Sequence, residues 1–307
     1  MARYVAGRLA LAVGGVWLVT TATFFALHVL PGNPFGNPHL APGVRSDLIA
    51  RYGLNLPLGQ QYVLYLHNLL RGRLGWSLVD PHRTVGAILA QGWPVSATLG
   101  LVTLAWSVPL GSLLGLAACR SRVGDALVLT VSIAGLAMPN FVLAAGLDAL
   151  FAVHLPWLPV AGWGRPAQAV LPSLALGAVP FALVARLVRA QAGTVLASDY
   201  VRGARAKGVE GWTLLRRHVL APALLPVVTA LGPMVAALLV GSFVVEHAFA
   251  IPGLGRAFVQ SVLDRDYPVV LGLTVFYAML LAAANLLSDL LAGVLDPRVR
   301  TAQLQRS

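Results

Sequence analysis

The sequence predicts an all-α, polytopic membrane protein with six transmembrane helices, and its composition and its apolar segments support this fold class. Of the 307 residues, 58% are hydrophobic and only 11% are charged, whereas about 25% of the residues in a soluble domain are charged. A helix needs about 20 mostly apolar residues to cross about 30 Å of hydrocarbon. Six segments meet this requirement: 9–30, 95–118, 126–153, 167–190, 220–245 and 268–294.

The first apolar segment follows Arg3 and Arg8, as the core of a signal peptide would. It is longer than a secretory core, however, and the LPGNP motif after it lacks a small-residue cleavage pattern. We therefore expect a retained transmembrane helix.

The distribution of basic residues predicts the orientation. An even number of spans places both termini on one side of the membrane. That side would carry 14 of the 22 basic residues and the opposite side 8, five of which fall in the long connection 31–94. Basic residues favour the cytoplasmic side, and those in long loops weigh less. We therefore expect both termini, and the polar segment between the fourth and fifth spans, in the cytoplasm.

The spans divide the chain into three parts. Residues 1–94 would hold the first helix and a long extracytoplasmic loop, residues 95–294 a transmembrane core with a cytoplasmic loop at 191–219, and residues 295–307 a cytoplasmic tail. Within the long loop, the apolar residues of 60–70 recur at helical spacing. They predict either an amphipathic helix on the outer membrane surface or a helix packed within the loop.

A short charged helix is expected in the cytoplasmic loop. Ser198 or Asp199 can cap its N-terminus by accepting a backbone N–H bond, and Gly208 can end it in a left-handed conformation. Because residues four apart share a helix face, Tyr200, Ala204 and Gly208 would form a narrow face with small residues. Such a face permits close backbone approach, and we expect the helix to contact a groove on a partner. A simple positively charged anchor is the alternative.

The sequence lacks the motifs of an enzyme. A P-loop requires GxxxxGK[ST], but the single lysine, Lys207, is preceded by Ala-Arg-Ala and followed by Gly208. HExxH is absent, no histidine lies in the middle of a span to serve a serine nucleophile, and Cys119 is the only cysteine. We expect no catalytic residue, no metal ion and no cofactor. The net charge of +11 is distributed by membrane topology, so nucleic acid is not an expected partner.

Candidates for a path through the membrane are prolines and polar residues inside the spans. A proline removes a backbone hydrogen bond, which is tolerated beside other helices or a water-filled cavity. Pro139 and Asn140 in the third span and Gly241 in the fifth are our candidates. Asp148, farther along the third span, suits either a functional role or solvation near the outer surface. Any single proline can equally serve only to shape the bundle.

Several motifs resemble one family over nearly the whole chain. The segment DYVRGARAKG at 199–208, followed by RHVLAPALLP at 217–226, is similar to the coupling loop of the inner-membrane permeases of ATP-binding-cassette (ABC) importers. The match is to the B-type permeases of the dipeptide, oligopeptide and nickel branch. The tract EHAFAIPGLGRAFVQSVLDRDYPVV at 246–270 is equally specific. Further matching segments are LPGNP at 30–34, YGLNLPLGQQY at 52–62, RGRLGWSL at 71–78 and LDPRVR at 295–300.

This resemblance implies a type I ABC importer permease fold in the cytoplasmic membrane of a bacterium or archaeon. It implies as partners a second homologous permease, two ABC ATPase subunits, an extracytoplasmic substrate-binding protein and membrane lipid. The general importer motif has Glu where this chain has Arg202, so the role of that Glu is not carried over. The residues expected to couple the chain to an ATPase are Asp199, Tyr200, Arg202, Ala204, Arg205, Lys207 and Gly208.

The function implied by the resemblance is to form half of a translocation path for di- or oligopeptides. We define the outer tract as residues 246–267, and we expect it to contact the binding protein or to act as an outer gate. The candidate residues are Glu246, Pro252, Gly253 and Gly255.

Three alternatives stay open at this point. The same class of importer can carry nickel or a metal chelate, because the binding protein does most of the selecting. A self-contained, ion-coupled carrier would need paired ionisable groups in mid-membrane and internal symmetry, and neither is seen. An ion channel would need a recurrent filter-like loop, which is missing from the sequence.

Overall fold

The computed structural model describes residues 2–29, 55–119 and 121–295. The LPGNP motif at 30–34 and the tail from residue 296 onward lie outside the described residues. The described residues form helices and no strand, apart from one isolated bridge between Trp76 and Thr84, so the all-α fold class is confirmed. The helices are α1 (Ala2–Val29), α3 (Leu58–Leu70), α4 (Val85–Ala118), α5 (Arg122–Ala137), α6 (Asn140–Asp148), α7 (Pro166–Leu196), α8 (Asp199–Ala206), α9 (Gly211–Leu214), α10 (Leu220–Leu239), α11 (Phe243–Ala248), α12 (Leu254–Leu263) and α13 (Tyr267–Leu295), with π-helical stretches at Ala149–His154 and Leu215–Val219.

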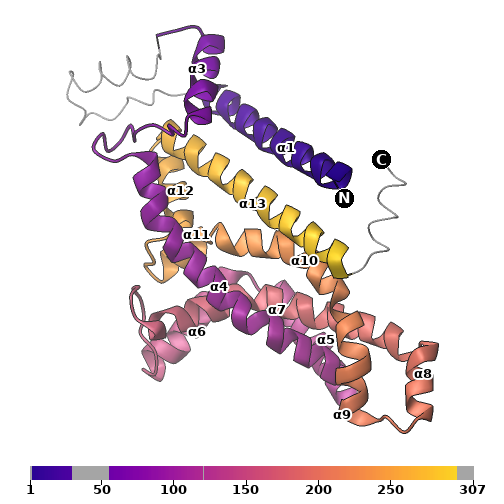
Figure 1. The fold of residues 1–307 in the computed structure, drawn as a ribbon. Coiled ribbons are helices and arrows are strands. Elements are labelled where there is room, and N and C mark those ends of the chain that lie inside the picture. The colour runs from indigo at the N-terminus through magenta and orange to yellow at the C-terminus, as the bar shows by residue number, and fades with distance from the viewer. Residues whose placement is uncertain (1, 30–54, 120, 296–307) are drawn as a thin grey trace.

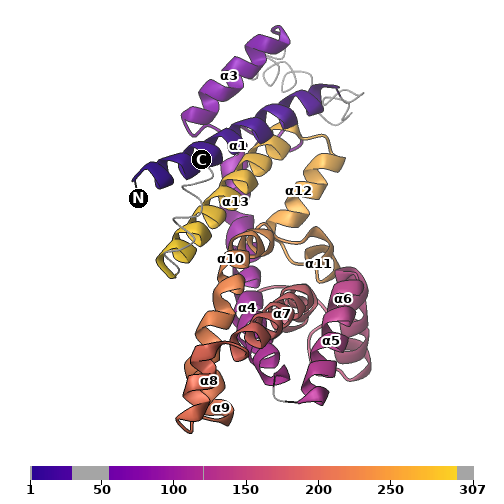
Figure 2. The same cartoon turned by 90° about the vertical axis from the view of Figure 1, so that its right-hand side faces the viewer.

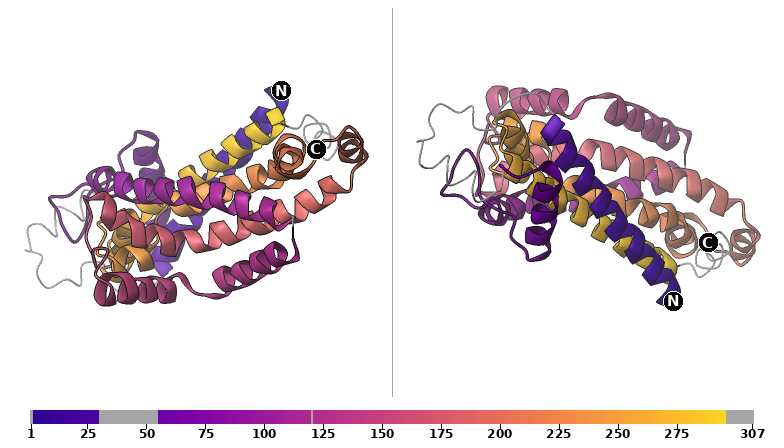
Figure 3. Two further views of the ribbon diagram at one scale, coloured as in Figure 1. Left: turned by 90° about the horizontal axis from the view of Figure 1, so that it is seen from below. Right: turned by 90° about the horizontal axis from the view of Figure 1, so that it is seen from above.

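The long helices run between two opposite ends of the molecule. The start of α1, the end of α13 and the short helix α8 lie toward one end, whereas α3 and α12 lie toward the other (Figures 1 and 3). Seen from the side, α1, α3 and α13 form one group, α5, α6 and α7 form another, and α4 and α10 lie between them (Figure 2). The short connecting helices therefore gather at the two ends, where loops between membrane spans belong.

Within the described residues, five helices are long and apolar enough to cross a membrane: Ala6–Val29, Val85–Ala118, Pro166–Leu196, Gly211–Ala248 and Tyr267–Ser288. A sixth crossing exists only if α5 and the helical pair 140–154 count together as one broken span, because their axes differ by 101°. The sequence predicted a proline kink within one span at this point. The structure instead shows a complete break, since Pro139 has no N–H to donate and Met138 before it is extended.

Helix α4 begins ten residues earlier than the predicted span. Thr84 caps it by accepting the Ala87 N–H (3.0 Å), and the helix continues through Pro94 to Ala118. The span was predicted to start after Pro94, whereas the helix begins at Val85 and contains Pro94 in its interior. The expected division of the chain at residue 94 therefore falls inside α4.

Helices α4 and α7 pack closely along their length. A Cβ atom added at Gly111 would lie 2.8 Å from the Phe181 carbonyl oxygen, and one at Gly115 would overlap the Ala185 carbonyl. Only glycine allows such an approach of two helix backbones. This contact forms part of the largest apolar core, which also includes the buried Val184 and Val188.

The helix expected at 60–70 is confirmed as α3, and it packs against α1. The Tyr62 hydroxyl lies 2.6 Å from that of Thr21, and Tyr62 and Tyr65 pack against the ring of Phe24. The opposite side of α3 is open, with Val63 and Leu70 mostly exposed. The tyrosine face thus fixes the C-terminal end of α1.

Candidate functional site

Helix α8 projects at the end of the molecule that also holds the start of α1 (Figures 1 and 3). Only Ala197 and Ser198 separate it from α7, which is one continuous helix of 31 residues. Ser198 occupies the N-cap position, but its hydroxyl donates to the Val195 carbonyl instead of capping α8. The expected side-chain cap is therefore absent at Ser198, and the hydroxyl instead joins α8 to the last turn of α7.

One face of α8 packs inward. Val201 is fully buried, and Ala204 is 8% exposed in the main core. The Tyr200 hydroxyl donates to the His218 carbonyl (2.9 Å), while the residue as a whole stays 51% exposed. Tyr200, Ala204 and Gly208 thus do not form one exposed face as predicted. Ala204 is buried, and its small side chain lets α8 lie close to the core of the protein, whereas Tyr200 and Gly208 stay exposed.

The outward face of α8 carries the charges. Asp199 and Arg202, both strongly exposed, form an ion pair with each other. Among the described residues, the exposed side chains of Arg205 and Lys207 have no hydrogen-bonding or ionic partner. The result is a basic surface whose cations are available to a partner.

Gly208 ends α8 as predicted. Its φ is +82°, in the left-handed region, and no heavy atom lies within 4 Å of the position that a Cβ would occupy. The Val209 N–H returns to the Ala204 carbonyl (3.2 Å), which closes the helix C-terminus. The glycine is therefore required by the backbone conformation and not by crowding.

At the other end of the molecule, Glu246 is fully buried (0% exposed). Its Oε1 accepts the hydroxyl of Ser96 on α4 (2.7 Å), and its Oε2 accepts the N–H of Arg256 on α12 (3.0 Å). The Ser96 hydroxyl oxygen also accepts the Leu254 N–H (2.8 Å). Glu246 was expected to contact the binding protein or to act in an outer gate. The structure places its side chain inside, where it joins α4, α11 and α12.

Glycines surround the Glu246 carboxylate. A Cβ at Gly241, which has φ +89°, would overlap the carboxylate and lie 2.9 Å from Ser96 Oγ, and one at Gly253 would lie 2.5 Å from the carboxyl carbon. A Cβ at Gly255 would lie 3.1 Å from Oε2. These glycines, which the sequence suggested for a path or a gate, therefore make room for a buried charge.

A second buried carboxylate fixes the end of the outer tract. Asp266 is 4% exposed and accepts the Leu78 N–H (3.0 Å) and the Ser77 hydroxyl. Burial raises the pKa of the Asp266 carboxyl above its ordinary value, although these hydrogen bonds act in the opposite direction. The outer tract is thus held at both ends, to α4 and to the loop before it.

Sequence reasoning missed Ser77, Ser96 and Asp266. Ser77 and Asp266 do fall inside the motifs RGRLGWSL and DRDYPVV, but a motif does not reveal which of its residues meet in space. Of the four outer candidates, only Pro252 is exposed. Within the described residues, no three His, Cys, Asp or Glu side chains gather closely enough to hold a metal ion.

The remaining path candidates lie at the break between α5 and α6. Pro139 precedes the first turn of α6, and Asn140, which begins that turn, is half-buried. Helix α6 packs against α7 and α11. Asp148, at the other end of α6, has a buried Oδ1 without a hydrogen-bond partner among the described residues. The break and the Glu246 cluster are therefore connected through α11.

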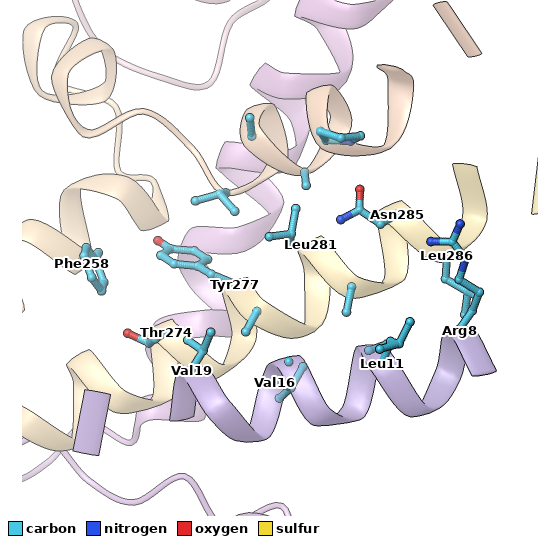
Figure 4. A pocket seen from close by; sticks show the side chains of 18 residues that line it. Arg8, Leu11, Val16, Val19, Phe258, Thr274, Tyr277, Leu281, Asn285 and Leu286 are labelled. Carbon is cyan, nitrogen blue, oxygen red and sulfur yellow. The ribbon is translucent and has the colours of Figure 1, made fainter. Parts of the chain in front are cut away.

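A groove of about 670 Å³ has α13 as its floor and α1 and α10 as its walls (Figure 4). Its lining is almost wholly apolar, with Arg8 and Asn285 at one end and Thr274 and Tyr277 toward the other. None of the predicted path residues lines it. Such a surface suits lipid or a neighbouring helix better than a hydrophilic solute.

Comparison with known proteins agrees with this arrangement. A family model described as "Binding-protein-dependent transport system inner membrane component" matches residues 107–301. The dipeptide transport system permease protein DppB of Bacillus subtilis is 41% identical over 303 residues, covering 98% of both chains. The oligopeptide transport system permease proteins OppB of Haemophilus influenzae and Escherichia coli K12 are 37% and 36% identical over 305 residues, covering 98% of this chain and 100% of theirs. The chain therefore belongs to the family of inner membrane components of binding-protein-dependent transport systems.

Proposed function

We propose that this chain is a membrane-spanning subunit of an ATP-driven importer and forms half of the path by which di- or oligopeptides cross the membrane. Its relatives are named as dipeptide and oligopeptide permeases, and the match extends over nearly their whole lengths. These names favour peptides over nickel or a metal chelate as the cargo.

The exposed helix α8 is the observation that carries the proposal. The sequence contains no P-loop, so ATP would be hydrolysed by separate subunits. Helix α8 packs on the core through Val201 and Ala204 and exposes Arg205 and Lys207 to a partner. This arrangement suits docking to such a subunit. The ion pair of Asp199 and Arg202 would fix the first turn of the docking face.

The other partners follow from the importer arrangement. A second, homologous permease would complete the path, and a binding protein outside would deliver the peptide to the end that holds the outer tract. The distribution of basic residues supports an orientation with both termini and α8 in the cytoplasm. The protein would reside in the cytoplasmic membrane of a bacterium or archaeon.

In this mechanism, closure of the ATPases moves α8. Because only two residues separate α8 from α7, the movement would pass directly to α7 and through its close glycine contacts to α4. Pro139 and Asn140, at the break beside α7, would then change the width of the path. Binding protein would release its peptide when the outer end opens.

Co-purification from native membranes, with identification of every bound chain, tests the proposal. We expect a second permease, two ATPases and a peptide-binding protein. Replacing Arg205 with Glu should release the ATPases, because it reverses a charge on the docking face. Arg216→Glu is the matched control, since Arg216 is also basic and exposed but lies beyond α9.

Two results would contradict the proposal. One is a protein that purifies alone and still moves solute in liposomes, which would identify a self-contained, ion-coupled transporter. The other is equal retention of the ATPases by the Arg205→Glu and Arg216→Glu variants, which would remove α8 as the docking element.

A further inference from the structure

We infer that Ser96 and Glu246 are positioning residues that couple the outer tract to α4, so that docking of a loaded binding protein outside is transmitted to α8 inside. This inference rests on the proposed importer function. It assigns no contact with peptide or ATP to either residue.

The first step of the argument is the way Ser96 is shared. Its hydroxyl donates to Glu246 Oε1 (2.7 Å) and accepts the N–H of Leu254, the first residue of α12 (2.8 Å). A hydroxyl that donates and accepts at once fixes the positions of both partners. One side chain of α4 therefore holds α11 through a carboxylate and α12 through a backbone amide.

The second step is the packing around this point. The side chain of Leu254 fills the space beside Gly92, one turn before Ser96, and belongs to a buried cluster with Val85 and Leu89 of α4. The start of α12 thus has no free space in which to move relative to α4. A displacement of the outer tract has to displace α4 as well, since tightly packed contacts transmit movement.

The third step is the length and contacts of α4. Its 34 residues extend about 50 Å as one helix. Its inner half packs against α7 at Gly111 and Gly115, whose missing Cβ atoms let the two backbones touch. Helix α7 in turn continues into α8 through two residues. The route from the outer tract to α8 therefore consists of close contacts from α12 to α4 and from α4 to α7, followed by the two-residue connection from α7 to α8.

The fourth step is the choice of residue at position 246. An apolar side chain would hold the same space without the desolvation that a buried carboxylate requires. A carboxylate gives what an apolar group cannot, which is a set of directional bonds from α11 to two other helices, α4 and α12. Glu246 is thus suited to fixing one arrangement of the outer tract on α4.

The test compares ATP hydrolysis by the reconstituted complex with and without saturating, peptide-loaded binding protein. In Ser96→Ala we expect basal hydrolysis within about twofold of wild type and loss of most of the stimulation by binding protein. Glu246→Gln should show the same pattern, and the double variant should lose less than the sum of the two single variants, because the two side chains share a hydrogen bond. Ser112→Ala is the matched control: this buried serine of α4 donates only to Val108 of its own helix.

The outcomes separate the inference from the function on which it rests. Full stimulation of Ser96→Ala, with wild type also stimulated, would overturn the inference alone. A Ser96→Ala complex that loses assembly and basal hydrolysis together would show a purely structural role and would also overturn it. If the Glu246→Gln complex fails to assemble, the Ser96→Ala result alone tests the inference, because Ser96→Ala leaves the Glu246 carboxylate with the Arg256 N–H that it accepts. A wild-type complex that binding protein never stimulates would remove the proposed function and this inference together.

Discussion

Helix α8 and the outer tract are both marked by specific motifs, yet they are built in opposite ways. Helix α8 turns its charged residues outward and attaches to the core through little more than Val201 and Ala204. The outer tract encloses the two carboxyl groups of Glu246 and Asp266, although Arg256, Asp264 and Arg265 stay exposed. The same kind of sequence signal thus marks a surface offered to another molecule in one region and an internal joint in the other.

Gly208 and Gly241, which both have positive φ, show the difference most clearly. Both adopt a conformation that residues with a Cβ rarely take. Gly208 has open space around it, whereas Gly241 faces Glu246 and Ser96. A glycine in a motif therefore indicates an unusual backbone conformation. The atoms packed around it decide how much a substitution would destabilise the protein.

The largest effect is expected for Gly241→Ala. The new Cβ would combine an unfavourable φ with overlap at the Glu246 carboxylate, and we expect a loss of stability of ~3 kcal/mol or more. Thermal unfolding in detergent, followed by size-exclusion chromatography, measures it. Gly146→Ala in α6 is the control, since nothing lies within 4 Å of its Cβ position. A Gly241→Ala protein as stable as this control would show that the outer tract is not a packed joint.

The next effect is expected for Gly208→Val. The substitution meets no neighbour but forces a β-branched residue into the left-handed region, at a strain of about 1–2 kcal/mol. Membrane insertion should stay intact, while retention of the ATPases falls. Gly208→Asn should retain them, because asparagine tolerates this conformation. Equal retention by both variants would show that the end of α8 plays no part in docking.

A smaller effect is expected at the break between α5 and α6, which belongs neither to helix α8 nor to the outer tract. Asn140→Leu removes a half-buried amide without changing the volume greatly. If Asn140 lines the path, peptide uptake in proteoliposomes should fall several-fold while recovery of the assembled complex changes little. Parallel loss of uptake and assembly would assign Asn140 to packing.

The smallest effect concerns the pH dependence of the outer tract. Because the pKa of Asp266 is raised in the folded protein, the folded protein binds the Asp266 proton more tightly than the unfolded chain does. That stabilisation is complete below the ordinary aspartate pKa of about 4 and is lost as the pH rises through the raised value. The unfolding temperature of wild type should therefore fall relative to Asp266→Asn between acidic and neutral pH, by a few degrees. The exposed Asp264→Asn serves as control, and a difference that is the same at every pH would contradict the assignment.

Much of the fold follows from local properties of the sequence. A segment of about 20 apolar residues favours a membrane-spanning helix largely independently of its neighbours. This predicted the five long spans, whereas the sixth predicted segment, 126–153, is broken at Pro139. Gly208 ends α8 through its own backbone conformation, so the sequence also predicted the C-terminal end of α8. The break at Pro139 was recognised as a proline effect, but its angle of 101° depends on the packing of α5 and α6 against α7.

The sequence by itself determined the apolar helices, the short charged helix and the positions at which the backbone must turn, because each depends on neighbours along the chain. Only the tertiary structure decided what the polar residues do. Ser96 and Glu246 are 150 residues apart, and Ser77 and Asp266 are 189 apart. Such pairs form only when distant helices pack together, so no local pattern reveals them. The packing therefore buries Glu246, which the sequence suggested as a surface contact, and makes it a link between helices.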